Sequence, residues 1–169
     1  PLRGKECSTQ QMPFISEKIP TFEEFANASI EDIYGDEIID AYERKVTSFE
    51  SIILINKGDN KFDIEKLPPL AQSIPILSSD VYDINSDGYE DVIIGGNIYN
   101  TEVETPRLDN QFALVLISDQ NKNYNVLGPD KSGLYLSGNT KSLKIIGDKN
   151  PKLLVANNNS ALEVFELNK

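Results

Sequence analysis

The chain has 169 residues, of which 16 are Lys or Arg and 27 are Asp or Glu, so its formal net charge is -11. It contains no His, no Trp and a single Cys. The missing imidazole excludes Ser-His-Asp catalysis, Cys-His catalysis and His-ligated zinc, and one thiol is too few for a structural zinc or an iron–sulfur cluster. Carboxylate, amide, hydroxyl and backbone oxygens are left, and these are the ligands that calcium prefers.

The composition also limits the partners. The acid excess predicts that the chain does not bind nucleic acid, because neutralising phosphates requires clusters of basic residues. No apolar stretch approaches the roughly 20 residues that a membrane-spanning helix needs. The first residue is Pro1 rather than Met, so we expect either a processed chain or a segment of a longer protein.

The first 46 residues are predicted to hold the helical part of the chain. Residues 1–20 mix Gly, Ser, Thr, Gln and Pro and are expected to be an irregular lead-in. Thr21 and Glu24 have the spacing of a capping box. Residues 21–46 then predict two short amphipathic helices, interrupted at Gly35, which we expect to be an insertion in the following domain or a cap on it. The apolar residues at helical spacing are Phe22, Phe25, Ile30 and Ile33 in the first helix, and Ile38, Ile39, Tyr42 and Val46 in the second.

Residues 47–169 are predicted to form a mainly β structure that is continuous with the helices as one domain. Short apolar or alternating runs are separated by Gly, Asn, Asp and Pro, which favours antiparallel strands joined by turns. The expected strands are 49–55, 61–66, 76–82, 91–95, 112–117, 124–127, 142–146, 152–156 and 162–166.

An internal repeat indicates how these strands are organised. The pattern of residues 54–64 recurs in residues 116–126, 62 positions later, and the pattern of residues 93–97 recurs in residues 153–157, 60 positions later. A period near 60 with about four strands per unit is typical of β-propeller blades, although most blades are shorter. The alternative is a coincidence among hairpins that share turn residues.

The strongest local signal is the segment Asp83–Asp91. Oxygen-bearing side chains at alternating positions converge when such a segment curls, and Gly88 permits a sharp turn. An EF-hand is excluded, because its twelfth position would be Ile94 instead of Glu and because strands are expected on both sides. The predicted calcium ligands are Asp83, Asn85, Asp87, the Tyr89 carbonyl and Asp91.

The segment resembles the calcium loop of FG-GAP/VCBS repeats, the blade units of integrin-α-like β-propellers. More of the chain is similar to the C-terminal region of bacterial VCBS-repeat proteins, which are common in Bacteroidetes. The similar stretches are Asn56-x-Gly58-x-x-x-Phe62, Leu67-Pro68 with Ala71-Gln72, Gly95-Gly96-Asn97, Arg107-Leu108-Asp109, Ser132-Gly133 and Asn157-Asn158-Asn159. The resemblance implies about two blades of an incomplete propeller ring.

The resemblance further implies one calcium ion per loop and a partner surface on the opposite side of the blades. The next repeat has only residues 147–152 at this place, with two lysines, and predicts a plain turn without an ion. The expected contact segment is 97–111, with Tyr99, Glu102, Glu104, Arg107 and Asp109. The alternative is that Arg107 and Asp109 pair and only brace this segment.

The resulting hypothesis is a calcium-stabilised, non-catalytic binding or structural module. We expect it in a secreted, periplasmic or cell-surface bacterial protein, with a protein or glycan as its ligand. Because two blades leave strand edges open, we also expect contact with the remainder of a larger propeller or with another copy of the chain. The alternatives are a carboxylate-dependent enzyme, such as a glycoside hydrolase using Glu102, Glu104 and Asp109, and a segment that serves assembly only.

Overall fold

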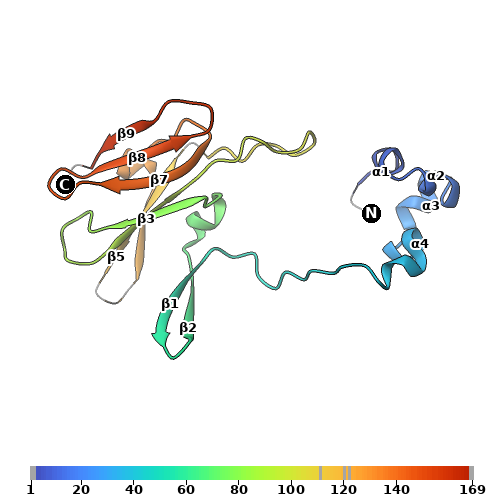
Figure 1. The fold of residues 1–169 in the computed structure, drawn as a ribbon, viewed down its shortest axis with the longest axis horizontal. Coiled ribbons are helices and arrows are strands. Elements are labelled where there is room, and N and C mark those ends of the chain that lie inside the picture. Colours follow the sequence, from blue (N-terminus) through green and yellow to red (C-terminus); the bar gives the residue numbers. More distant parts are fainter. Residues whose placement is uncertain (1–2, 111, 120, 122, 168–169) are drawn as a thin grey trace. The chain divides into compact units, whose positions relative to one another are not determined.

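A computed structural model describes residues 3–110, 112–119, 121 and 123–167 of the chain. The chain divides into two compact units, Pro1–Thr47 and Ser48–Lys169, and each is described here by itself. Figure 1 labels their elements in chain order. Within the described residues, no helix has the length and apolar character that a bilayer crossing requires.

The first unit is a small helical cluster. Ser29 and Asp32 form a capping box, as do Thr21 and Glu24, so two consecutive helices start within a few residues of each other. A core of Ile15, Ile19, Phe25 and Ile33 holds the helices together. The elements are α1 (Lys5–Gln11), α2 (Phe14–Lys18), α3 (Phe22–Asn27), α4 (Ile30–Tyr34) and the 3-10 helix η1 (Gly35–Ile38).

This unit differs from the sequence-based expectation in two ways. Residues 5–11 and 14–18 are helical, so the prediction of an irregular lead-in is wrong there. The predicted helix over 38–46 is also wrong, because the described residues 39–51 form no helix. The side chains of Ile39, Tyr42 and Val46 are exposed, and a helix this short is unstable unless its apolar face packs against something.

The second unit is mainly β, as predicted, and all nine expected strands are confirmed with small shifts of their ends. The strands are β1 (Ile52–Gly58), β2 (Lys61–Lys66), β3 (Ser78–Tyr82), β4 (Asp91–Gly95), β5 (Ala113–Ser118), β6 (Tyr124–Leu127), β7 (Thr140–Ile146), β8 (Lys152–Asn157) and β9 (Glu163–Glu166). The remaining elements are the 3-10 helix η2 (Pro69–Ser73) and the short helix α5 (Pro129–Ser132).

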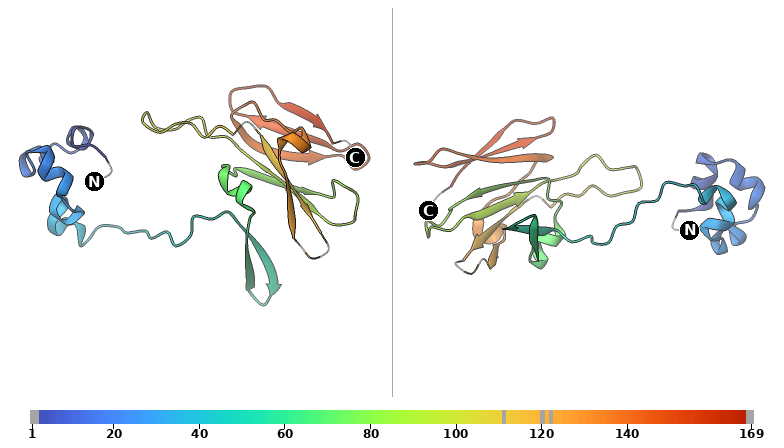
Figure 2. Two further views of the ribbon diagram at one scale, coloured as in Figure 1. Left: turned by 180° about the vertical axis from the view of Figure 1, so that it is seen from behind. Right: turned by 60° about the horizontal axis from the view of Figure 1, so that its bottom comes forward.

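The nine strands form three antiparallel sheets. We call them the N-terminal hairpin (β1–β2), the central sheet (β3–β4–β5–β6) and the C-terminal sheet (β7–β8–β9). The central and C-terminal sheets lie face to face (Figure 2). Nearly every residue of β4 and β5 is buried, because the central sheet is covered on both of its faces.

Two core clusters cover these faces. The first joins the central sheet to the C-terminal sheet and contains Ile93, Val115, Leu143, Leu153 and Val155. The second lies on the opposite face of the central sheet, where Ile94, Leu114 and Leu116 pack against Leu67, Ala71 and Ile74. Ile53 of the N-terminal hairpin also packs against the second cluster.

Polar side chains of β3 fasten the C-terminal sheet to the central sheet. The backbone N–H of Ile145 donates to Asp80 Oδ2 at 2.5 Å, and Lys144 forms an ion pair with Asp80 at 2.8 Å. The N–H of Leu143 donates to Ser78 Oγ at 2.9 Å. The outer edge of β7 therefore finds acceptors on a neighbouring sheet, although no strand pairs with it among the described residues.

The pairing registers bear on the internal repeat. Leu54 pairs with Ile64 in the hairpin as Leu116 pairs with Val126 in the central sheet, so the 62-residue offset relates equivalent positions. The 60-residue match is different, because Ile93 and Leu153 face each other across the first cluster. Equivalent residues must occupy the same face of successive sheets, and a shift by one residue exchanges the faces. Ile93 lies on the face of the central sheet that points to the following sheet, whereas Leu153 lies on the face of the C-terminal sheet that points to the preceding one. The 60-residue match therefore does not relate equivalent positions.

Candidate functional site

The segment Asp83–Asp91, which we call the acidic loop, connects β3 to β4. Two of its residues have left-handed backbone conformations, Ser86 with φ 61° and Gly88 with φ 89°. These conformations turn the chain back toward Asp83. The Asp83 carboxylate accepts hydrogen bonds from the N–H of Asp87 at 3.1 Å and from the N–H of Gly88 at 3.0 Å. The start of the loop thereby organises its far side.

Asn85 and Asp87 complete the turn. Asn85 Oδ1 also accepts from the N–H of Asp87, at 3.1 Å, and Asp87 Oδ1 accepts from the N–H of Tyr89 at 2.9 Å. The Asn85 amide donates to Asp87 Oδ2 at 2.8 Å. The structure therefore brings together the side chains at positions 83, 85 and 87, as the alternating pattern predicts.

Asp91 anchors the acidic loop to the central sheet. Its side chain is fully buried at the first position of β4. Asp91 Oδ2 accepts from the N–H of Ile84 at 2.9 Å, and Oδ1 accepts from the N–H of Ser118 at the end of β5, also at 2.9 Å. The Ser118 hydroxyl donates to the Glu90 carbonyl at 2.7 Å. Asp91 therefore joins three separate segments, a role that the motif by itself does not reveal.

The donor chemistry of the acidic loop fits a hard cation. Its side chains supply three carboxylates and one amide oxygen, and a carboxylate that accepts N–H bonds still has lone pairs for a cation. Within the described residues, no three acidic or Cys side chains are arranged as a group that could hold a metal ion. In this conformation, backbone N–H groups supply positive partial charge to the carboxylates of Asp83, Asp87 and Asp91.

The equivalent connection between β7 and β8 spans residues 147–151. It turns at Gly147, which has a φ of 83°. The Tyr82 hydroxyl donates to the Asp148 carbonyl at 3.4 Å and so ties this turn to the central sheet. The absence of an ion here stays a prediction.

Residues 97–110, which we call the arm, extend away from the sheets (Figure 2). The predicted contact segment also included Gln111, which lies outside the described residues. Ile98 and Leu108 exchange two backbone hydrogen bonds, of 2.9 and 2.8 Å, and thereby pair the two sides of the arm. Near the tip, the N–H of Thr105 donates to the Glu102 carbonyl at 3.0 Å. Val103 is fully exposed there.

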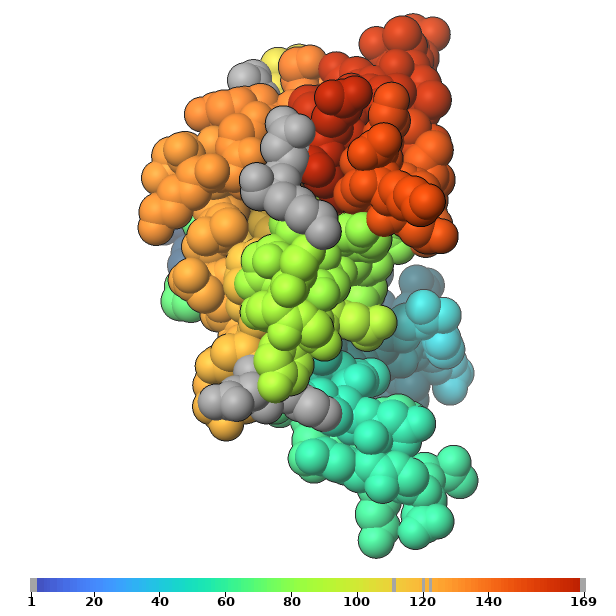
Figure 3. All heavy atoms as spheres, turned by 90° about the vertical axis from the view of Figure 1, so that its left-hand side faces the viewer, coloured from blue at the N-terminus to red at the C-terminus, as the bar shows by residue number. Residues whose placement is uncertain are grey.

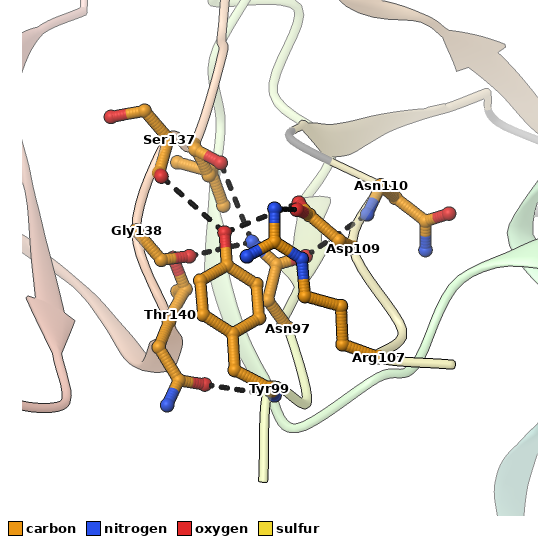
Figure 4. A network of polar contacts seen from close by, with 10 residues as sticks. Asn97, Tyr99, Arg107, Asp109, Asn110, Ser137, Gly138 and Thr140 are labelled. Atoms are coloured by element: carbon orange, nitrogen blue, oxygen red, sulfur yellow. Dashed lines mark hydrogen bonds and ion pairs between the residues drawn. The ribbon is translucent and has the colours of Figure 1, made fainter. Parts of the chain in front are cut away.

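Tyr99, Arg107 and Asp109 gather at the base of the arm (Figure 4). Arg107 pairs with the Asp109 carboxylate at 2.7 Å, and its guanidinium lies 4.5 Å from the centre of the Tyr99 ring. The Tyr99 hydroxyl donates to Asp109 Oδ1 at 3.2 Å. Burial and the nearby Asp109 charge both raise the pKa of Tyr99. Pairing of Arg107 with Asp109 is confirmed, and the pair braces the arm.

The two glutamates of the predicted contact surface lie nearer the tip, apart from that cluster. Glu102 Oε1 accepts from the Thr105 hydroxyl at 2.7 Å and so stabilises the turn. Glu104 follows the exposed Val103. Of the carboxylates considered for a glycoside hydrolase, Asp109 and Glu102 thus both take part in holding the arm in shape.

Asn97 is a residue of this network that motif analysis missed. Its side chain is fully buried, donates to the Gly138 carbonyl at 2.7 Å and accepts from the N–H of Asn110 at 3.3 Å (Figure 4). Its own N–H donates to the Thr140 carbonyl at 3.0 Å. Asn97 therefore fastens both ends of the arm to the start of the C-terminal sheet. The signal in the sequence was the run Gly95-Gly96-Asn97, in which an Asn follows two glycines at the end of a buried strand.

Comparisons with known proteins assign the chain to no family. No family model matches the chain, and neither a curated protein nor a solved structure matches it.

Proposed function

We propose that residues 48–169 form a calcium-stabilised, non-catalytic binding or structural module of the FG-GAP/VCBS type, in a secreted, periplasmic or cell-surface bacterial protein. The acidic loop carries this proposal. Asp83 and Asp87 accept backbone N–H bonds within one tight turn between two strands, and the last carboxylate of the loop, Asp91, is buried in the central sheet. That combination supports a loop whose charge is balanced by a hard cation.

The residues that would hold the ion are Asp83, Asn85, Asp87, the Tyr89 carbonyl and Asp91. When bound, calcium supplies two positive charges that offset the mutual repulsion of the three carboxylates. Asp91 would connect the ion to the sheet, because its two oxygens already bind the N–H groups of Ile84 and Ser118. Calcium would thus fix the loop relative to β4 and β5.

The arm supports the binding part of the proposal. Its base is held by Asn97 and by the Arg107–Asp109 pair, while Val103 at its tip is exposed. A rigid base with an exposed tip is a common arrangement for a recognition loop. We propose a protein or a glycan as its ligand.

Thermal unfolding with calcium and with a chelator tests the role of the ion. Calcium at ten times its dissociation constant should add about 1.4 kcal/mol to the free energy of unfolding. For a unit of this size, that corresponds to a rise of roughly 5 °C in the melting temperature. The substitution Asp87→Asn should abolish this rise.

A matched control is Asp148→Asn, which changes an exposed carboxylate in the turn where no ion is expected. This variant should keep the full response to calcium. Equal melting temperatures of the wild type in calcium and in chelator would contradict the proposal.

A further inference from the structure

Residues 42–49, which we call the connecting segment, run between the helices of the first unit and the first strand of the second unit. The boundary between the two compact units lies within this segment, after Thr47. These residues form no helix or strand, and all of them are exposed. In the described part of the chain, their large apolar side chains, Tyr42, Val46 and Phe49, belong to none of the three core clusters. The connecting segment is therefore not part of either core.

The backbone of the connecting segment is held at both ends but not between them. On one side, the N–H of Ala41 donates to the Ile38 carbonyl at 3.2 Å. On the other side, Glu50 forms an ion pair with Lys66 of β2 at 2.5 Å. Among the residues that the structure describes, no backbone hydrogen bond joins residues 42–49 to another part of the chain. Exposed backbone that lacks such bonds is a preferred place of cleavage by proteases.

A pair of basic residues, Arg44 and Lys45, lies at the centre of the connecting segment. Arg44 binds within the segment, because its Nε donates to the Tyr42 hydroxyl at 2.9 Å and its guanidinium lies 5.1 Å from the centre of the Tyr42 ring. In the described structure, no ion pair or hydrogen bond holds the Lys45 ammonium group. Proteases of the trypsin class hold the basic side chain that precedes the cleaved bond in a pocket with a carboxylate at its base. Lys45 is available to such a pocket, with residues 42–44 before it and residues 46–49 after it.

The connecting segment also carries side chains that a simple spacer does not need. Flexible linkers are rich in Gly and Ser, whereas Tyr42, Val46 and Phe49 are exposed by 82, 60 and 91%, respectively. Val46 directly follows the Lys45–Val46 bond, and the two aromatic residues lie at the ends of the segment. Large apolar and aromatic side chains are typical anchors of recognition between proteins. These residues therefore favour recognition of the segment by another protein.

Several other exposed basic residues lie in backbone that is hydrogen-bonded. Lys57 and Lys61 belong to the N-terminal hairpin, which projects as a lobe (Figure 3) but whose two strands pair with each other. On the arm, the bond after Arg107 is fixed because the N–H of Leu108 donates to the Ile98 carbonyl at 2.8 Å. A protease can cleave such sites only after they open locally, and the small open population slows the reaction. The connecting segment needs no such opening.

We propose that the connecting segment is a processing site, at which an endoprotease specific for basic residues separates the first unit from the second. Water is added across the Lys45–Val46 peptide bond, so that Lys45 gains a carboxylate and Val46 gains an amino group. Each product keeps its complete core, because none of the described core residues lies in the connecting segment. The second unit, with the acidic loop and the arm, is thereby released from the helices.

Limited digestion of the full chain with trypsin, followed by intact mass spectrometry, tests the proposal. The cut that separates the two units should lie after Lys45 or Arg44 and should precede any cut within the second unit. The double substitution Arg44→Gln and Lys45→Gln should slow this separation by about tenfold or more, because the remaining basic sites must open before they are cleaved. Lys149→Gln, which removes an exposed basic residue from the turn between β7 and β8, should leave the rate unchanged. An earlier cut within the second unit, or an unchanged rate in the double variant, would overturn the proposal.

Two further measurements distinguish recognition of the basic pair from general accessibility and from unfolding. Subtilisin, a protease of broad specificity, should still cleave the double variant within residues 42–49, because the substitutions leave the backbone exposed. After cleavage of the wild type by trypsin, the second unit should keep the melting temperature that it has in the intact chain, as measured by circular dichroism. Resistance of the segment to subtilisin, or a lower melting temperature after cleavage, would also overturn the proposal.

Discussion

The buried carboxylate of Asp91 should contribute to stability even without calcium, and Asp91→Asn tests this. Asparagine has nearly the same size, but it offers one acceptor oxygen where the carboxylate offers two. Its NH2 group would then face the N–H of either Ile84 or Ser118, which each donate to Asp91 at 2.9 Å. One charge-assisted hydrogen bond is lost and one buried N–H is left without an acceptor. Both describe one broken contact, and breaking a hydrogen bond to a charged group costs roughly 1.5–3 kcal/mol, so we expect the free energy of unfolding to fall by about 2–3 kcal/mol.

Denaturant unfolding in the presence of a chelator measures this effect separately from calcium binding. The chain has no Trp, so circular dichroism is the suitable probe. The midpoint should fall while the slope stays constant, because the surface exposed on unfolding does not change. Amide exchange at Ile84 and Ser118 should accelerate in the variant. Asp148→Asn, as the exposed control, should change the free energy of unfolding by less than about 0.5 kcal/mol. A similarly small change for Asp91→Asn would refute the reasoning.

Two further predictions concern the packing of β3 and the turn after β4. Burial opposes ionisation of Asp80, but the hydrogen bonds from Lys144 and the β7 backbone outweigh it and lower its pKa below 3.8. The contribution of the ionised Asp80 to stability is therefore present above that value and is lost as the pH falls through the folded-state pKa. Asp80→Asn should flatten the acid side of a plot of melting temperature against pH. Parallel curves for the variant and the wild type would contradict this. In Gly96→Ala, the new Cβ would lie 2.7 Å from the Leu77 Cβ and 2.9 Å from the Leu77 backbone N, and this clash should lower the free energy of unfolding by roughly 1–3 kcal/mol in denaturant unfolding. The control is Gly4→Ala, whose Cβ meets nothing within 4 Å. An equal effect of both substitutions would rule out the steric cause.

The β part of the fold was predictable because its signals are local. Runs such as Val92–Gly95 and Ala113–Ser118 are short, apolar and bounded by turn residues, which is enough to place a strand. The helical part was less predictable. Ile39, Tyr42 and Val46 have helical spacing but no core to pack against, so spacing alone was misleading. The helix Lys5–Gln11 begins after Gly4 without a side-chain cap and therefore gave no start signal.

The candidate site divides in the same way. Asp83, Asn85 and Asp87 are close in sequence, and their alternation predicted their convergence. The role of Asn97 depends on carbonyl groups about 40 residues away, at Leu136 and Gly138. Such long-range hydrogen bonds leave no periodic pattern in the sequence. The buried position of Asp91 and its bond from Ser118 could not be foreseen for the same reason.

The most direct test of the calcium proposal is a calorimetric titration of the chelator-treated chain with calcium. The account predicts one ion per chain and the loss of binding in Asp87→Asn, while Asp148→Asn binds as the wild type does. Absence of binding to the wild type, or unchanged binding in Asp87→Asn, would contradict it.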